Sequence, residues 1–391
     1  MLHQTMVVVR KELTDAFRDR RALMSIVFSI LFGPVIVGFM MNRLADRQRE
    51  AEDVRIPIVG AEHAPALVDW LGQQSGVTIA SGPQDAEAAV RDQREDVVLV
   101  IPKDFAERFR VSKPAPVRIV ADSARSAARP TVERVRGLLQ RYSSELGSLR
   151  LITRGVSPAI VTPLEIKDIE VSSAQQRAAT ILGFIPMFVV LAAFIGGMQI
   201  AIDSTAGERE RGSLEPLLVN PVPRGVLAAG KWLAATSTSM LAVVASATLC
   251  VMLMRFIPLQ DLGLRFRIGA PQLAGMLAVL LPFCPLAAAI QACIGTSARS
   301  FKEAQSYMTI VTVVPMLPGL LATLYPVTTS RTWAYPIPIL GQYGLLTSLL
   351  GGRWPSPLAF VAAGAACLIV AAVLVRVITR LFHSERIIFG R

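Results

Sequence analysis

The sequence contains few of the side chains that most often carry catalysis or bind metals. Its 391 residues include three histidines in separate regions and four cysteines, all of which lie in apolar stretches. It has no H-E-x-x-H, paired-cysteine or G-x-S-x-G motif. We therefore predict no catalytic residue, no metal site and no disulfide framework.

A complete nucleotide-binding loop is also missing. Residues 225–231 read G-x-x-x-x-G-K, but Trp232 follows where a phosphate-binding loop has Ser or Thr to hold Mg²⁺. Prolines precede this segment, where such a loop needs a strand. The sequence therefore predicts no cofactor bound by this chain. If ATP drives the protein, ATP and Mg²⁺ bind to a separate subunit.

Charged residues are scarce within six apolar stretches that are each long enough to cross the roughly 30 Å hydrocarbon layer as a helix. Hydrophobic residues make up 52% of the chain, which is too apolar for an ordinary soluble domain. The predicted fold class is an α-helical polytopic membrane protein with six transmembrane helices. The expected spans are residues 22–41, 180–202, 231–257, 271–296, 305–325 and 357–378.

The middle of these spans contains no Asp, Glu or Arg. A proton-coupled transporter normally places ionisable groups near the bilayer midplane, so a secondary transporter is disfavoured. The main polar side chains within the spans are Gln199 and Gln291. These two either join helices by hydrogen bonds or line a pathway.

The positive charge of the chain is concentrated around the apolar stretches. The net charge is +11, yet residues 42–179 hold 20 Lys/Arg and 19 Asp/Glu. With the N-terminus inside, the short cytoplasmic segments carry 15 Lys/Arg and the short external loops carry five. This bias predicts a multi-pass protein with both termini cytoplasmic. An Ala- and Arg-rich composition favours a bacterial inner membrane, and no segment indicates nucleic-acid binding.

The long segment 42–179, between the first two spans, predicts an inserted extracytoplasmic mixed α/β domain with parallel strand pairing, because strand and helix patterns alternate along it. Strands are expected at 55–59, 77–80, 96–101 and 117–121, and helices at 64–74, 84–94, 103–110 and 129–150. A five-helix region, 180–391, follows. Within it, residues 326–356 predict an outer re-entrant segment or a plain loop, because the apolar part is too short to span.

Residues 1–21, ahead of the first span at 22–41, predict an amphipathic helix. Apolar side chains recur every three or four residues at Met6, Val9, Leu13 and Phe17. A basic amphipathic helix directly before a span typically lies in the membrane interface and contacts lipid. The alternative is a helix packed on a soluble partner. The residues expected to place this helix are Arg10, Lys11, Glu12, Leu13, Phe17, Arg18 and Asp19.

The cytoplasmic loop 203–230 has the most informative pattern. Charged residues, a glycine stop and a short apolar-acidic segment closed by proline predict a compact turn with a short helix. A fully solvated loop is typically polar, whereas this segment contains Leu214, Leu217 and Leu218. We therefore predict that leucines are exposed here and dock a partner.

This loop resembles the signature of type-2 ABC exporter permeases, in the branch that includes NatB-like sodium-export permeases. The family pattern is roughly E-R-E-x-G-[ST]-L-E-x-L-L-x-x-P-[VI]-x-R, followed by a helix carrying G-K. Residues 208–224 match it, and Gly230 and Lys231 supply the G-K. The R-K-E-L segment at 10–13 resembles the N-terminal helix of the family, and a large first insert followed by five closely spaced spans is the layout of the branch.

The resemblance implies the permease subunit of an ATP-driven exporter that acts as a homodimer with two cytoplasmic ATPase subunits. It implies efflux of a cation such as sodium or of a small toxic or amphipathic compound, and leaves open a periplasmic partner for 42–179. The alternative is a non-transporting receptor or assembly protein that displays the 42–179 domain. The resemblance also implies that the turn couples the ATPase to the spans through Glu208, Arg209, Glu210, Arg211, Gly212, Ser213, Leu214, Glu215, Leu217 and Leu218.

Overall fold

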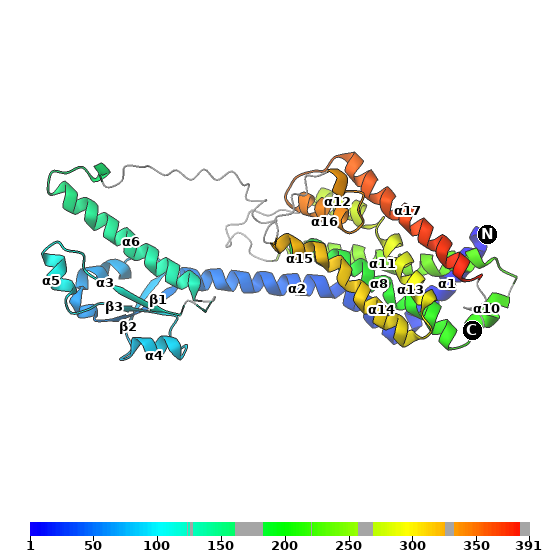
Figure 1. The fold of residues 1–391 in the computed structure, drawn as a ribbon, viewed down its shortest axis with the longest axis horizontal. Coiled ribbons are helices and arrows are strands. Elements are labelled where there is room, and N and C mark those ends of the chain that lie inside the picture. The colour runs from blue at the N-terminus through cyan, green and yellow to red at the C-terminus, as the bar shows by residue number, and fades with distance from the viewer. Residues whose placement is uncertain are drawn as a thin grey trace. The chain divides into compact units, whose positions relative to one another are not determined.

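The computed structural model describes residues 1–122, 124–125, 128–160, 183–219, 221–256, 269–324 and 332–383. The chain divides into two compact units (Figure 1). One unit comprises Met1–Asn42 and Val171–Arg391, and the other comprises Arg43–Glu170. The start of the second predicted span, at 180–182, lies outside the described residues.

The first unit is helical. Six helices in the described part of the chain are long and apolar enough to cross a membrane, which confirms the predicted fold class at this level. These candidate spans are Arg20–Arg43, Phe184–Glu210, Arg224–Leu253, Ala270–Ser297, Phe301–Leu321 and Pro357–Leu381. The described helices of eight or more residues that form the unit are α1 (Leu2–Arg18), α2 (Arg20–Glu52, whose last residues belong to the second unit), α8 (Phe184–Ile202), α11 (Arg224–Leu253), α12 (Ala270–Leu280), α13 (Cys284–Ser297), α14 (Phe301–Val313), α15 (Leu317–Leu324), α16 (Leu340–Leu350) and α17 (Pro357–Leu381).

Several helices extend beyond their apolar stretches. Helix α2 continues to Glu52, eleven residues past the predicted end of the first span at Met41, because residues 43–52 are mostly Arg, Ala, Glu and Gln, which favour helix. Helix α11 begins at Arg224 rather than near Lys231. Hydropathy marks only the apolar part of a helix, so it places the ends of these helices too early or too late.

Prolines interrupt two of the spans, as their lack of an N–H donor leads one to expect. Pro282 lies between α12 and α13, and Pro315 lies in a short 3-10 turn between α14 and α15. Helix α16 falls in the predicted outer segment 326–356 and is buried through most of its 11 residues. It packs beside α8, where the Tyr343 hydroxyl donates a hydrogen bond to the Gly183 carbonyl at 3.1 Å.

Asp19 forms the joint between the N-terminal helix and the first span. Its backbone is extended, which ends α1 at Arg18. Its carboxylate accepts a hydrogen bond from the Arg21 backbone N–H at 2.9 Å, as a capping side chain does at the start of a helix. The two helices are therefore separate elements with a fixed boundary.

The second unit contains a four-stranded sheet with the strand order β2-β1-β3-β4. Strand β1 pairs in parallel with β2 and β3, whereas β4 is antiparallel to β3. The strands lie where the sequence predicts them: β1 (Val54–Val59), β2 (Val77–Ser81), β3 (Val97–Val100) and β4 (Arg118–Ala121). The parallel pairing is confirmed, except that the last strand reverses direction.

Helices connect and cover the strands of this sheet. They are α3 (Pro65–Gly72), α4 (Ala86–Arg91), α5 (Phe105–Arg110) and α6 (Arg129–Ile152). Helix α6 buries Val135 and Leu138 in the same apolar core as Ile56 and Leu99 of the sheet. The core explains why this segment folds as a compact unit, since each element buries its apolar face against another.

Candidate functional site

The signature turn is an extension of α8 and not a separate loop. Helix α8 passes into a π-helical segment, η3 (Asp203–Gly207), and then into the single turn α9 (Glu208–Glu210). Segments of π-helix inside α-helices are rare and frequently occur at functional sites. A short helix, α10 (Leu214–Val219), follows and precedes α11.

Gly212 produces the sharp reversal between α9 and α10. Its φ angle is +68°, a left-handed conformation that glycine adopts without steric penalty. The Gly212 N–H donates to the Arg209 carbonyl and the Ser213 N–H donates to the Glu208 carbonyl. These two bonds form a Schellman motif, which ends a helix in a fixed geometry. The predicted glycine stop and short helix are thus present.

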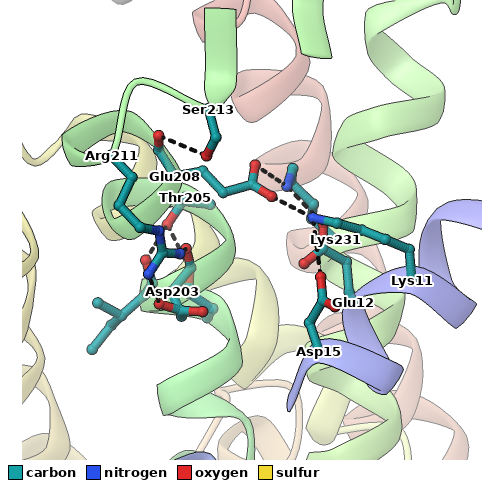
Figure 2. A network of polar contacts seen from close by, with 11 residues as sticks. Lys11, Glu12, Asp15, Asp203, Thr205, Glu208, Arg211, Ser213 and Lys231 are labelled. Atoms are coloured by element: carbon teal, nitrogen blue, oxygen red, sulfur yellow. Dashed lines mark hydrogen bonds and ion pairs between the residues drawn. The ribbon is translucent and has the colours of Figure 1, made fainter. Parts of the chain in front are cut away.

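A buried cluster of charges joins this turn to α1 and α11 (Figure 2). The Lys231 ammonium lies 2.8 Å from Glu12 Oε1 and 2.6 Å from Glu208 Oε2. The Lys11 ammonium lies 2.6 Å from the other carboxylate oxygen of Glu208, 3.2 Å from Glu12 and 3.5 Å from Asp15. Two ammonium groups and two buried carboxylates therefore connect three separate segments of the chain.

Burial decides how strongly these groups depend on one another. The side chains of Lys231, Glu12 and Glu208 are 2%, 5% and 7% exposed. A charge removed from water to this extent is tolerated only when it is paired and hydrogen-bonded. Burial lowers the pKa of Lys11, but hydrogen bonds and charges from Glu208 and Glu12 outweigh that effect and raise the pKa above its ordinary value. Lys11 therefore stays charged at physiological pH.

The G-K of the signature explains how α1 comes so close. A side chain on Gly230 would collide with Val8 of α1, since a Cβ there would lie 2.5 Å from Val8 Cγ1. The absence of a side chain lets α1 pack against α11, and the next residue, Lys231, then reaches Glu12. Lys231 is not among the residues that the sequence pattern predicts for the site. Its position next to a glycine, at the start of an apolar stretch, was the signal available.

Two other residues of the signature bind the segment between α13 and α14. The Phe301 backbone N–H donates a hydrogen bond to Glu210 Oε2 at 2.6 Å, so Glu210 helps to cap α14. The Arg209 guanidinium donates to the Ala298 carbonyl at 3.2 Å. The predicted coupling residues Glu208, Arg209 and Glu210 therefore connect the turn to other helices of the first unit.

The prediction of exposed leucines is wrong for Leu214, which is 4% exposed. The Schellman turn directs this first residue of α10 inward, where it anchors the short helix. Arg211, Gly212 and Ser213 are exposed, and Leu217 is half-buried. The side chains of Glu215 and Leu218 lie outside the described residues. The outward side of the turn is thus formed by 211–213 and by part of α10.

The two glutamines predicted to join helices or line a pathway have different settings. Gln291 is 1% exposed and donates from Nε2 to the Phe194 carbonyl at 2.5 Å, which joins α13 to α8. Gln199 is half-buried on α8. Among the described residues, no three His, Cys, Asp or Glu side chains are arranged to hold a metal ion.

Residues 21–380, nearly the whole chain, match the sequence model of a protein family described as ABC-2 family transporter protein. The chain belongs to the ABC-2 transporter family. It is 28% identical over 350 residues to the ABC transporter permease protein NatB of Bacillus subtilis, covering 88% of this chain and 89% of that protein. It is 21% identical over 238 residues to the probable multidrug ABC transporter permease YbhR of Escherichia coli, covering 59% and 60% of the two chains.

These similarities support the assignment of the chain as an ABC transporter permease subunit and as a membrane protein. Membership of the family implies a partner ATPase subunit, as the resemblance in the turn predicts. The residues of the charge cluster lie at 11–12, 208 and 231, so the family match covers the turn and α11 but begins after α1.

Proposed function

We propose that this ABC-2 family permease couples ATP hydrolysis on two separate cytoplasmic ATPase subunits to export, acting with a second permease copy. In this proposal both termini are cytoplasmic, the Arg43–Glu170 unit is extracytoplasmic, and the outward side of the turn docks the ATPase. The observation that supports it most is the charge cluster. Through Glu208, any displacement of the turn is passed to Lys231 of α11 and to Lys11 of α1.

The cluster makes the turn and the first helices move together. Separating Glu208 from Lys231 would break a buried ion pair and leave each charge with one partner, Lys11 for Glu208 and Glu12 for Lys231, at a cost of up to about 3–5 kcal/mol. A rigid displacement that keeps the pairs intact avoids that penalty. ATP-driven closure of the ATPases therefore moves α1, α9 and α11 as one body, and the π-helical segment η3 is where α8 can bend.

The proposed cargo is a cation such as sodium or a small amphipathic compound. No Asp, Glu, Lys or Arg occurs in residues 22–42, 184–202, 232–254 or 357–375, so those stretches offer hydroxyl, amide and carbonyl groups to a passing ion. The amphipathic alternative is favoured by an apolar groove of about 350 Å³ between α13 and α14, lined by residues such as Cys293, Tyr307 and Ile310. The multidrug name of the E. coli relative agrees with it.

The first experiment is to express the chain together with its cognate ATPase, purify the complex and measure ATP hydrolysis in lipid. We expect a stable complex whose hydrolysis depends on the permease, and whose rate changes with Na⁺ or with members of an amphipathic compound panel. A permease that purifies alone under every nucleotide condition would favour a receptor or assembly role for the Arg43–Glu170 unit.

Leu217→Asp tests the docking surface. A charge on the half-buried side of α10 should weaken ATPase binding at least tenfold while the permease stays folded, because the change lies on the outward side of the turn. The matched control is Val111→Asp, an exposed apolar residue of the second unit that is 58% exposed. Equal ATPase binding and stimulation in both variants would place the docking surface elsewhere.

A further inference from the structure

Helix α1 has an apolar flank that its packing against α8 and α11 leaves partly exposed. Its buried residues are Val9, Glu12 and Ala16. Next to them, Met6 is 64% exposed and Phe17 is 48% exposed, with Leu13 between them. Together with Val9 they form the floor of an open groove of about 550 Å³. The residues that line it are Met6, Val9, Arg10, Leu13, Thr14, Phe17 and Arg18.

The apolar floor of this groove, at Leu13 and Phe17, faces away from the signature turn, whereas Arg18 lies at the edge nearer to Lys11. Successive residues of an α-helix are about 100° apart around its axis. Lys11 and Asp15 form a charged flank of α1. Leu13 follows Lys11 by two residues and Phe17 follows Asp15 by two residues, so each apolar side chain lies about 200° around the helix axis from its charged neighbour. The charged flank is the side on which Lys11 meets Glu208 of the turn. A partner docked on the turn therefore lies on the other side of α1 from the apolar floor of the groove.

The edge of the groove is basic. The lining includes Arg10 and Arg18 and no acidic side chain. Both arginines are exposed, and neither guanidinium has an ion-pair partner within the described part of the chain. They lie eight residues apart, about 12 Å along the helix axis, so both long side chains can reach a group held above Thr14. Guanidinium groups bind phosphate through paired hydrogen bonds.

The position of the groove along the chain points to the lipid headgroup layer. The first candidate span begins at Arg20, directly after the Asp19 joint. The groove therefore lies on a helix that ends where a membrane span starts, at the depth where headgroups meet acyl chains. An apolar floor with two cationic groups at its edge matches an acidic phospholipid in both of its parts.

We propose that this groove binds a phospholipid with an anionic headgroup. Arg10 and Arg18 contact the headgroup, and Met6, Leu13 and Phe17 contact the upper part of the acyl chains. The bound lipid holds the apolar flank of α1 at the membrane surface, while the charge cluster holds the charged flank against the turn and α11. The proposal does not depend on which compound is exported.

The test uses the full chain with Phe17→Trp, reconstituted in phosphatidylcholine membranes that contain phosphatidylglycerol. Bromine on the acyl chains of either lipid quenches a nearby tryptophan, and the unsubstituted protein gives the background from its four tryptophans. At equal amounts of brominated lipid, we expect stronger quenching from brominated phosphatidylglycerol. Arg10→Gln with Arg18→Gln should lower the preference by about fivefold for each arginine.

Arg20→Gln with Arg21→Gln is the matched control. It removes two exposed charges at the same end of the first span but outside the groove, and the preference should persist. Equal loss in both double variants would overturn the proposal and leave general attraction of basic residues to the membrane. Equal quenching by the two lipids would also overturn it. So would quenching that disappears when the ATPase binds, because the groove would then be part of the ATPase contact.

Discussion

Helix α11 makes two kinds of contact within a few turns, and they differ in what holds the helices together. At Lys231 it is fixed by buried charges from α1 and from the signature turn. At Ala235 and Ala242 it is fixed by two glycines of α8. A Cβ on Gly196 would lie 2.4 Å from Ala242 Cβ, and one on Gly197 would lie 2.7 Å from the Ala235 carbonyl oxygen.

The difference shows which contact can transmit a signal. Close packing through glycine depends on shape alone, so it keeps two helices together and is indifferent to what happens elsewhere. The charge cluster depends on groups from three segments at once, because each carboxylate has two ammonium partners. A displacement of one segment therefore changes the electrostatic energy of the other two. Breaking each contact separately distinguishes the two roles.

Lys231→Met should have the largest effect. It leaves Glu12 and Glu208 buried side by side, with Lys11 as the remaining cation, and should destabilise the permease by about 3–5 kcal/mol. Thermal unfolding of the purified protein in lipid would show it as a large drop in the melting temperature. Stimulation of the ATPase should be lost as well, since the turn is no longer tied to α11.

The control for this variant removes the carboxylates too. Lys231→Met with Glu12→Gln and Glu208→Gln leaves no unpaired buried charge, so most of the stability should return. ATPase stimulation should stay low if the cluster transmits motion. Full recovery of both stability and ATPase stimulation would show that the charges only neutralise one another and do not transmit motion. A Lys231→Met protein that melts like the parent would contradict the buried cluster itself.

Gly197→Ala should have the next largest effect. The added methyl group would meet the Ala235 carbonyl and Gln291 Oε1, so α8 and α11 must separate, at about 1–3 kcal/mol. The melting temperature should fall, but the ATPase stimulation per folded permease molecule should stay unchanged. Gly38→Ala is the control, because no atom lies within 4 Å of the added group. If Gly197→Ala uncouples the ATPase while stability is unchanged, shape and charge do not have the separate roles assigned to them.

The sequence predicts the elements of this molecule better than it predicts their contacts. In the part of the chain that the structure describes, six apolar stretches give six candidate spans and alternating strand patterns give four strands, because burial and periodicity are local properties. Gly212 and the following short helix are likewise local signals of a turn. The antiparallel direction of β4 is not local, since nothing within residues 118–121 fixes which way the chain returns.

The charge cluster illustrates the same limit at the site. Glu12 and Lys231 are 219 residues apart, and Lys11 and Glu208 are 197 residues apart. Each stands in a segment that the sequence singles out, 10–13, 208–224 or the G-K at 230–231, but the pairing follows only when α1 has been placed on α11. Leu214 shows the complementary error. Its apolar character predicts an exposed docking residue, but the turn geometry buries the side chain within the chain.

Arg211→Gln should have the smallest effect and sharpens the comparison most. Arg211 and Asp203 form an ion pair at 3.0 Å in the same turn as Glu208, but their side chains are 57% and 35% exposed. Water solvates both groups when the pair is broken, so the loss should be under about 1 kcal/mol and should shrink further as salt is added. Melting temperatures of Arg211→Gln and Lys231→Met, compared at low and high salt, measure the contrast directly. If the exposed pair proves as important as the buried one, position in the turn and not burial gives the cluster its strength, and the coupling role must then be assigned to the whole turn from Asp203 to Ser213.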